Sequence, residues 1–219
     1  MSRTKQILGV VAVVVGYIAI KGTFATIKAT MKADNQSNRP VAAQVASVKK
    51  TTLPNVFFDG TGELKLPTGW ESLSQGNLPK QVLFRATNPS QNADLLVMRV
   101  PKLTKLSEDQ LYVMGDGMSE KVAATSHIPN PQIDATKVTK VNGYAAAQFE
   151  IKGTPSKRYS LNNQPLQGEV TILLTTVSTK NSVYSIVAAA PSKDYQKHQA
   201  AIKQTIQGFS EYGTAAFTK

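Results

Sequence analysis

The stretch EVTILLTTVSTKNSVYSIVAAA, residues 169–190, contains two runs rich in β-branched and apolar residues, separated by four polar residues that favour a turn. Successive side chains of a β-strand point to opposite faces, and both faces of these two runs are apolar. The opposed sets are Val170, Ile172 and Leu174 against Leu173 and Val177 in the first run, and Tyr184 and Ile186 against Val183 and Val187 in the second. The pattern therefore predicts a hairpin of interior strands, in a sheet that other elements cover on both sides.

Runs that precede this hairpin predict further strands. Short apolar runs at 56–58 and 63–66 end at turn signals, and Trp70, the single tryptophan, follows the second of them. Residues 81–87 alternate, with Val82, Phe84 and Ala86 on one face and Leu83, Arg85 and Thr87 on the other. A turn at 88–92 leads to an apolar run at 93–100, so we expect these two strands to pair as a hairpin.

A helix is predicted from about residue 107 to residue 125. The segment Ser107-Glu-Asp-Gln110 matches a capping box. The apolar residues that recur at helical spacing are Leu111, Met114, Met118 and Val122. Gly115 and Gly117 interrupt this pattern, and each costs about 1 kcal/mol relative to alanine inside a helix. They predict either a kink or a close packing contact at the middle of the helix.

The second half of the chain contains another hairpin, a polar segment and a last helix. Asn142-Gly143 is the strongest short-range hairpin signal and joins two runs within residues 134–152. In the second run the predicted core-facing set is Ala145, Ala147, Phe149 and Ile151, and the predicted solvent-facing set is Ala146, Gln148, Glu150 and Lys152. Residues 153–168 predict a long loop that acts as a mobile flap or a binding loop.

The last helix should start at Pro191-Ser192. Its predicted buried face consists of Tyr195, Ile202, Ile206 and Phe209, with Gly208 near the C-terminal cap. Residues 211–219 would then form a small polar tail.

The first 32 residues contain an uncharged apolar run, Ile7–Ile20, with Arg3 and Lys5 before it and Lys21 after it. A helix of this length covers about 21 Å, against a hydrocarbon core of about 30 Å. Lys21 can snorkel to the headgroups, however, and residues 22–27 continue a mostly apolar helix. No clear A-x-A cleavage site closes the run. We therefore predict an uncleaved membrane anchor over residues 1–32, with a cleaved signal peptide as the alternative, and a flexible linker over residues 33–54.

The formal net charge of +11 is distributed unevenly along the 219 residues. The first 50 residues hold eight Lys and Arg residues and one Asp, a net charge of +7, which leaves +4 for the rest. No basic run interleaved with aromatic residues follows residue 50, so nucleic-acid binding is not expected. The chain has no cysteine, which excludes disulfides, thiolate nucleophiles and sulfur-ligated metals.

Few side chains are candidates for catalysis or metal binding. His127 and His198 are the only histidines, and no G-x-S-x-G motif or paired base accompanies them. Both are interpreted as surface or packing residues. Asp116 and Glu120, four residues apart on the predicted helix, could share a cation with Asp109, but a solvated acidic face is the preferred interpretation.

Two further motifs are incomplete. Asp59, Thr61 and Glu63 mimic the start of a calcium loop but lack its glycine and its final glutamate, and Gly60-Thr-Gly62 lacks the lysine of a phosphate loop. The sequence therefore predicts no catalytic, cofactor-binding or metal-binding residues, and no enzymatic activity.

Strands, a helix, strands and a final helix predict an α+β domain, with a largely antiparallel sheet and helices packed on it. Several segments, in this order, resemble the PsbP/DcrB-like superfamily. They are Glu63-Leu-Lys-Leu-Pro-Thr-Gly-Trp70, the hairpin near Asn88-Pro89, Lys140-Val-Asn-Gly143, Val183-Tyr-Ser-Ile-Val187 and Pro191-Ser-Lys-Asp-Tyr195. The resemblance covers about Asn55 to Ser210 and implies an α-β-α sandwich, preceded here by one N-terminal transmembrane helix.

The superfamily includes photosystem II extrinsic subunits, a nuclear factor that binds the Ran GTPase, DcrB-type envelope proteins and chaperones of secreted effectors. The resemblance therefore implies a non-catalytic binding scaffold. DcrB-type proteins are typically held by a lipidated cysteine, which this chain lacks, so the helical anchor would replace it. The resemblance also favours the periplasmic side of the inner membrane for the domain, although Lys21, Lys28 and Lys32 after the apolar run Ile7–Ile20 give no such preference.

We expect a membrane-tethered accessory or assembly module that binds another envelope or membrane protein through the domain at residues 55–210. The alternative is an extracytoplasmic carrier or sensor of a small apolar ligand or lipid. An exposed apolar patch, or a cleft beside residues 153–168, would favour the first function. An enclosed pocket would favour the second.

Overall fold

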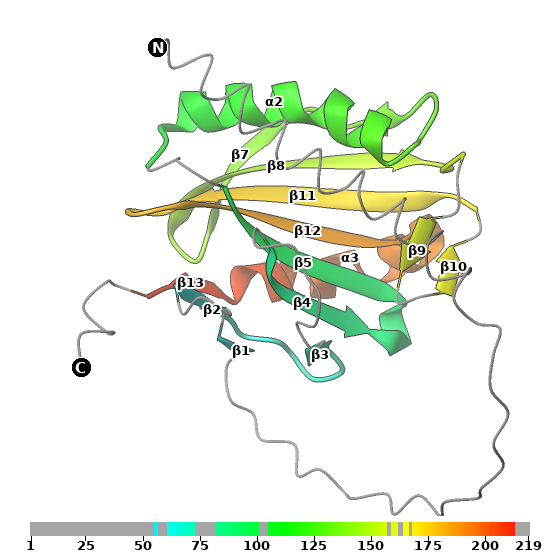
Figure 1. Ribbon diagram of the computed structural model, residues 1–219, viewed down its shortest axis with the longest axis horizontal. Coiled ribbons are helices and arrows are strands. Elements are labelled where there is room, and N and C mark those ends of the chain that lie inside the picture. Colours follow the sequence, from blue (N-terminus) through cyan, green and yellow to red (C-terminus); the bar gives the residue numbers. More distant parts are fainter. Residues whose placement is uncertain are drawn as a thin grey trace, which may run out of the picture.

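The computed structural model describes residues 55–56, 61–72, 82–100, 105–156, 159–161, 164–166 and 168–212. Within these ranges an eight-stranded sheet has the order β3-β4-β5-β12-β11-β8-β6, and β7 also pairs with β8 (Figure 1). Smaller sheets are formed by β1-β2-β13 and by β9-β10.

The elements follow the chain in this order: β1 (Asn55–Val56), β2 (Gly62–Leu64), β3 (Glu71–Ser72), β4 (Val82–Asn88), the 3-10 turn η1 (Pro89–Gln91), β5 (Ala93–Val100), α2 (Glu108–Thr125), β6 (Gln132–Ile133), β7 (Lys137–Val141), β8 (Tyr144–Gly153), β9 (Tyr159–Leu161), β10 (Gln164–Leu166), β11 (Val170–Ser178), β12 (Val183–Pro191), α3 (Ser192–Gln207) and β13 (Phe209–Glu211).

The central hairpin is formed as predicted. β11 and β12 are antiparallel, and their paired residues run from Val170 opposite Pro191 to Ser178 opposite Val183. β8 flanks β11 and β5 flanks β12, so both strands are interior. The Thr179 hydroxyl closes the turn, because it donates to the carbonyl of Ser182 (2.7 Å) and accepts from the Ser182 amide (3.0 Å).

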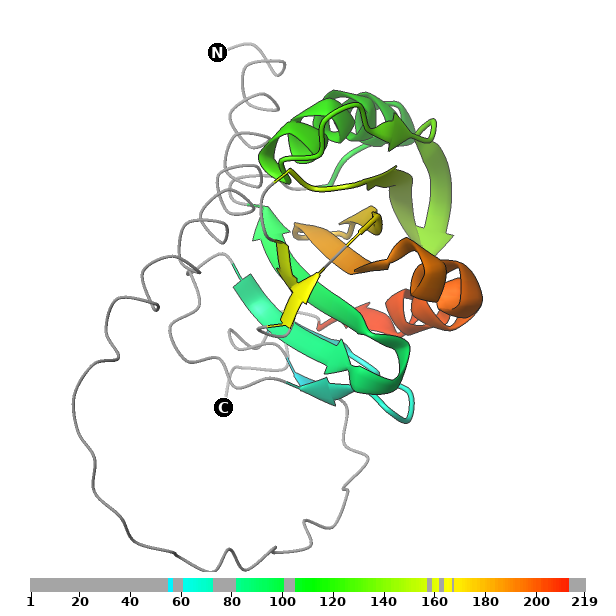
Figure 2. The ribbon, with the colours of Figure 1, turned by 90° about the vertical axis from the view of Figure 1, so that its right-hand side faces the viewer.

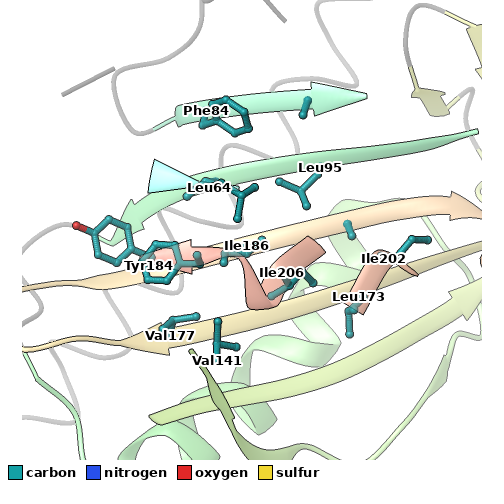
Figure 3. Close-up of a cluster of buried hydrophobic side chains, with 14 of the residues drawn as sticks. Leu64, Phe84, Leu95, Val141, Leu173, Val177, Tyr184, Ile186, Ile202 and Ile206 are labelled. Carbon is teal, nitrogen blue, oxygen red and sulfur yellow. The ribbon is translucent and has the colours of Figure 1, made fainter. Parts of the chain in front are cut away.

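The sheet separates two apolar clusters, one under each helix. Ile172 belongs to the α2-side cluster and Leu173 to the α3-side cluster, as the alternation predicted. α2 and α3 cover opposite faces of the sheet in Figure 2, and Figure 3 shows the α3-side cluster, in which Leu64 of the small sheet also takes part. The predicted α-β-α layering of a largely antiparallel sheet is thereby confirmed. In the part of the chain that the structure describes, no helix is long and apolar enough to span a membrane, and the predicted anchor at residues 1–32 lies outside that part.

α2 begins with the predicted capping box. The Ser107 hydroxyl accepts from the Gln110 amide (3.3 Å), and the Gln110 side chain accepts from the Ser107 amide (3.0 Å). Leu111, Met114, Met118 and Val122 are fully buried. A Cβ atom built on Gly115 would lie 2.7 Å from Thr136 Cγ2, whereas one built on Gly117 would meet nothing within 4 Å. A kink or a close packing contact was predicted for this part of α2. The structure shows the close packing contact, at Gly115.

β4 and β5 form the predicted hairpin around η1, but the predicted faces are wrong at the start of β4. The register shifts between Val82 and Phe84, which is a β-bulge. Leu83 and Phe84 therefore both join the α3-side cluster, whereas Val82 joins the α2-side cluster. Simple alternation had grouped Val82 with Phe84.

Asn142 and Gly143 form the predicted turn between β7 and β8, and their φ angles of 46° and 83° suit a two-residue hairpin turn. The predicted core face of β8 is confirmed, since Phe149 packs under α2. The prediction that the opposite face is solvated is wrong. Ala146 is fully buried in the α3-side cluster, and Glu150 is only partly exposed because α3 packs over it.

α3 starts after Pro191 and is capped by Gly208, as predicted. Phe209 was predicted on the buried face of this helix, but it opens β13 and pairs with Leu64. The next strand residues include Glu211, which the sequence had placed in the tail and which pairs with Gly62. The chain thus turns from helix to strand at Gly208 and returns to the start of the domain.

Residues 153–168 contain regular structure that the sequence did not predict. β9 and β10 pair as a short antiparallel hairpin within this segment. The Ser156 amide and hydroxyl both donate to the His127 carbonyl, at 2.7 and 3.0 Å, and attach the start of the segment to the end of α2.

Candidate functional site

Glu150 of β8 is the centre of a polar cluster under α3. Its Oε1 atom accepts hydrogen bonds from the Tyr195 hydroxyl (2.9 Å) and the Gln199 amide (3.1 Å), and it lies 2.8 Å from Lys203 Nζ. The three partners are spaced four residues apart on α3, so they share one face of the helix. The cluster therefore joins the helix to β8, which lies next to the edge of the sheet.

This cluster shifts the pKa values of its two acidic groups in opposite directions. Burial by itself raises the pKa of the Glu150 carboxyl, but the hydrogen bonds from Lys203, Tyr195 and Gln199 and the charge of Lys203 outweigh burial and lower it. Burial, followed by the charge and hydrogen bond of Glu150, raises the pKa of the Tyr195 phenol well above its ordinary value. At neutral pH Glu150 is therefore ionised, and Tyr195 keeps the proton that it donates.

A cleft of about 270 Å³ opens beside the cluster, between α3 and the edge of the sheet at β6 and β8. Its lining residues are Gln132, Asp134, Glu150, Lys152, Thr171, Tyr195, Gln196 and Gln199. Lys152 pairs with Glu169 at 3.3 Å, and the Thr171 hydroxyl lies 3.0 Å from that of Ser192. The lining is polar, and within it Glu150 accepts the hydrogen bonds of Tyr195 and Gln199. Among the described residues, this lining includes none from the segment 153–168, beside which a cleft would have favoured a protein-binding module.

A second surface lies on the opposite layer and exposes apolar side chains. In the described part of the chain, three large apolar side chains are exposed: Tyr112 (46%) and Val113 (61%) of α2, and Val138 (40%) of β7. Exposed carboxylates of α2 surround the first two. We term this set, which comprises Tyr112, Val113, Val138, Glu108, Asp109, Asp116 and Glu120, the α2–β7 surface.

Packing at Gly115 brings the two elements of this surface together. The Cβ position of Gly115 lies 3.6 Å from the Cβ of Ala147, and Val138 is the register partner of Ala147 on β7. Partners in an antiparallel pair share a face of the sheet, so Val138 faces α2. Tyr112 lies one helical turn before Gly115. Tyr112 and Val138 therefore border the same junction of α2 and β7, which lie side by side in Figure 1.

The carboxylates are placed at helical neighbours of the apolar residues. Asp109 and Asp116 lie four residues before and three after Val113, and Glu108 and Asp116 lie four residues before and four after Tyr112. All four carboxylates of α2 are exposed, and among the described residues none has a hydrogen-bond or ion-pair partner. Tyr112 and Val113 are therefore flanked by carboxylates that have no partner among the described residues.

The structure places the residues that the sequence analysis had considered for catalysis or metal binding. His127 lies in the turn after α2 with a φ of 55°, and His198 lies on α3, partly buried. Asp116 and Glu120 are exposed on α2 as predicted, and no group of three His, Asp or Glu residues within the described ranges could hold a metal ion. Trp70 is buried in the α3-side cluster.

Part of the incomplete calcium motif can be placed. Glu63 lies in β2 and accepts a 2.7 Å hydrogen bond from the Tyr212 hydroxyl. Asp59 and Gly60 lie outside the described residues. This hydrogen bond links β2 to the residue that follows β13, and so supports the small sheet.

Sequence reasoning missed both the Glu150 cluster and the apolar part of the α2–β7 surface. A signal for the second was present, because Tyr112 and Val113 lie off the buried stripe that includes Leu111 and Met114. The four-residue spacing of Tyr195, Gln199 and Lys203 on α3 was also visible in the sequence. The sequence did not show that these side chains contact Glu150 on β8.

Comparisons with known proteins identify solved structures with a similar fold. No protein-family model matches the sequence, and no curated protein matches it significantly. Among solved structures, cyanobacterial PsbP (CyanoP) from Synechocystis has a TM-score of 0.52 at 11% identity, over 78% of this chain and 98% of that chain. The chain has a PsbP-like fold. The Ran-binding protein Mog1p of Saccharomyces cerevisiae is similar to this PsbP-like chain with a TM-score of 0.51 at 12% identity, over 75% of this chain and 97% of its own. The predicted resemblance to the PsbP/DcrB-like superfamily is confirmed at the level of the fold.

Proposed function

We propose that this chain is a non-catalytic accessory or assembly module, tethered to a membrane by residues 1–32, whose PsbP-like domain binds another membrane or envelope protein. The α2–β7 surface is the proposed contact. The observation that carries this proposal is the exposure of Tyr112 and Val138 where α2 meets β7, with Val113 exposed on the outer side of the same helix. Single exposed apolar residues need no explanation, whereas a grouped set is typical of interaction sites. Contact with a partner would remove apolar area from water, which is favourable by about 25 cal/mol per Å².

The cleft beside Glu150 does not support the alternative, a carrier or sensor of a small apolar ligand. Sites for such ligands are lined mainly by apolar and aromatic side chains. The cleft is lined by amides, carboxylates, Lys152 and the hydroxyls of Thr171 and Tyr195. Desolvating these groups would cost free energy, and an apolar ligand could not offset this cost because it forms no hydrogen bonds with them.

The proposed location is the inner membrane, with the domain on the periplasmic side. The apolar run Ile7–Ile20 supports the tether, and the superfamily resemblance supports the side. The linker at residues 33–54 would let the domain reach a partner at some distance from the bilayer.

Site-specific photo-crosslinking in intact membranes tests the contact. A photoreactive residue at Val113 of the full chain should form an adduct with one or a few proteins, which mass spectrometry would identify. The matched control is the same residue at Lys193, which is exposed on α3 in the opposite layer. Equal adducts at both positions, adducts with lipid alone, or none at Val113 would contradict the proposal.

A further inference from the structure

We propose that the segment bound at the α2–β7 surface is a basic amphipathic segment of the partner protein. Its apolar residues would pack on Tyr112, Val113 and Val138, and its Lys or Arg side chains would pair with the carboxylates of α2. This inference rests on the proposed function and specifies the chemistry of the partner.

The distribution of ion pairs supports a cationic partner. Asp94, Glu150 and Glu169 each pair with an Arg or Lys of this chain, at 2.9, 2.8 and 3.3 Å. The four carboxylates of α2 have no such pair among the described residues, although the chain as a whole carries a net charge of +11. Lysines are thus abundant, yet Lys121 is the only one within α2. The free carboxylates of α2 are concentrated around Tyr112 and Val113, whereas Val138 lies between Lys137 and Lys140 on β7.

The same charges argue against other occupants of the surface. An anionic bilayer and a nucleic acid would both bring negative charge against four carboxylates. A second copy that used the same surface would place α2 carboxylates opposite α2 carboxylates, and like charges across an interface disfavour it. A protein segment that combines apolar anchors with positive charge satisfies both parts of the surface.

Peptide binding to the full chain tests this chemistry. The chain is held in zwitterionic nanodiscs, and the probe is a fluorescent 18-residue helical peptide with a leucine face and a lysine face. The comparison peptide carries glutamate in place of every lysine, and empty nanodiscs give the blank. We expect the lysine peptide to bind at least tenfold more tightly, with a preference that falls between 0.1 and 1 M salt as the Debye length shortens from about 10 to about 3 Å. Attraction by net charge alone predicts the opposite preference, because the chain is positive.

Two sets of variants locate the binding. Asp109→Lys combined with Asp116→Lys should reverse the preference to the glutamate peptide, and Tyr112→Ser combined with Val113→Ser should weaken both peptides. Glu71→Lys, an exposed carboxylate on β3, is the matched control and should change nothing. Circular dichroism confirms that each variant keeps its fold.

Specific results would overturn the inference. The inference would be overturned by equal affinity for the two peptides, or by an unchanged preference in the Asp109→Lys and Asp116→Lys variant. It would also be overturned if the chain bound anionic vesicles in preference to the peptide, or if it self-associated in a way that Val113→Ser abolished. If the Val113 crosslink to a protein survives Asp109→Lys and Asp116→Lys, the proposed function stands and the basic character of the segment is refuted. If Val113 crosslinks to no protein, the proposed function itself fails.

Discussion

A methyl group on Gly115 should destabilise the domain, although alanine is normally the better helix residue. The new Cβ would lie 2.7 Å from Thr136 Cγ2 and 3.2 Å from Thr136 Oγ1, whereas carbon atoms pack best at about 3.5–4.0 Å. Overpacking of this kind costs about 1–3 kcal/mol, and the gain in helix propensity returns about 1 kcal/mol. The same change at Gly117, where no atom lies within 4 Å, should keep that gain in full. The two variants should therefore differ in the free energy of unfolding by about 1–3 kcal/mol.

Urea denaturation followed by circular dichroism measures this difference. A third variant, Gly115→Ala with Thr136→Ser, removes the Cγ2 atom and should recover most of the lost stability relative to Thr136→Ser alone. The close approach of α2 to residue 136 would be refuted if Gly115→Ala were as stable as Gly117→Ala, or if the Thr136→Ser change gave no recovery.

Four further predictions concern the core, the Glu150 cluster and the termini. Ile172→Asp or Ile186→Asp should unfold the domain, because a carboxylate without a partner would be buried at a cost of several kcal/mol; melting like that of the wild type would contradict the core assignment. The lowered pKa of Glu150 implies a stabilisation that is present above its ordinary value of 4.5 and is lost as the pH falls through the folded value. Thermal melts from pH 6 to pH 2 should therefore show a shallower decline for Glu150→Gln than for the wild type, and equal slopes would argue against the cluster. Residues 51–219 alone should melt cooperatively, because the described strands and helices supply both clusters; a broad transition would mean that the first 50 residues belong to the fold. Ile7–Ile20 should persist in the mature protein, as intact mass and alkaline extraction can show, whereas a mature N-terminus near Thr26 would indicate a cleaved signal peptide.

Local patterns in the sequence predicted the elements of the fold. The two-sided alternation of residues 170–187 and the Asn142-Gly143 turn depend on neighbours along the chain, so both were readable. Patterns that continue past a change of structure misled the prediction. Phe209 keeps the spacing of the α3 face but follows Gly208 into β13, and Leu83 keeps the alternation of β4 but lies at a bulge.

Contacts across the fold were beyond local reasoning. Glu150 was assigned to solvent because its partners Tyr195 and Gln199 lie 45 and 49 positions away. The acidic face of α2 was predicted from the sequence. The position of Val138 beside α2 follows only from the register of β7 and β8. Two exposed apolar side chains, Tyr112 and Val138, border that junction.

The pairing of β13 with β2 also determines when the domain can be completed in the cell. The hydrogen bond from Tyr212 to Glu63 joins residues 149 positions apart. At about 5–20 residues per second, a ribosome would need roughly 7–30 s to synthesise the chain between them. Throughout that interval Leu64 lacks Phe209, its partner in both the small sheet and the α3-side cluster. A nascent chain therefore carries an open edge at β2 until Phe209 has been synthesised, and a premature stop just before Phe209 would leave that edge open permanently.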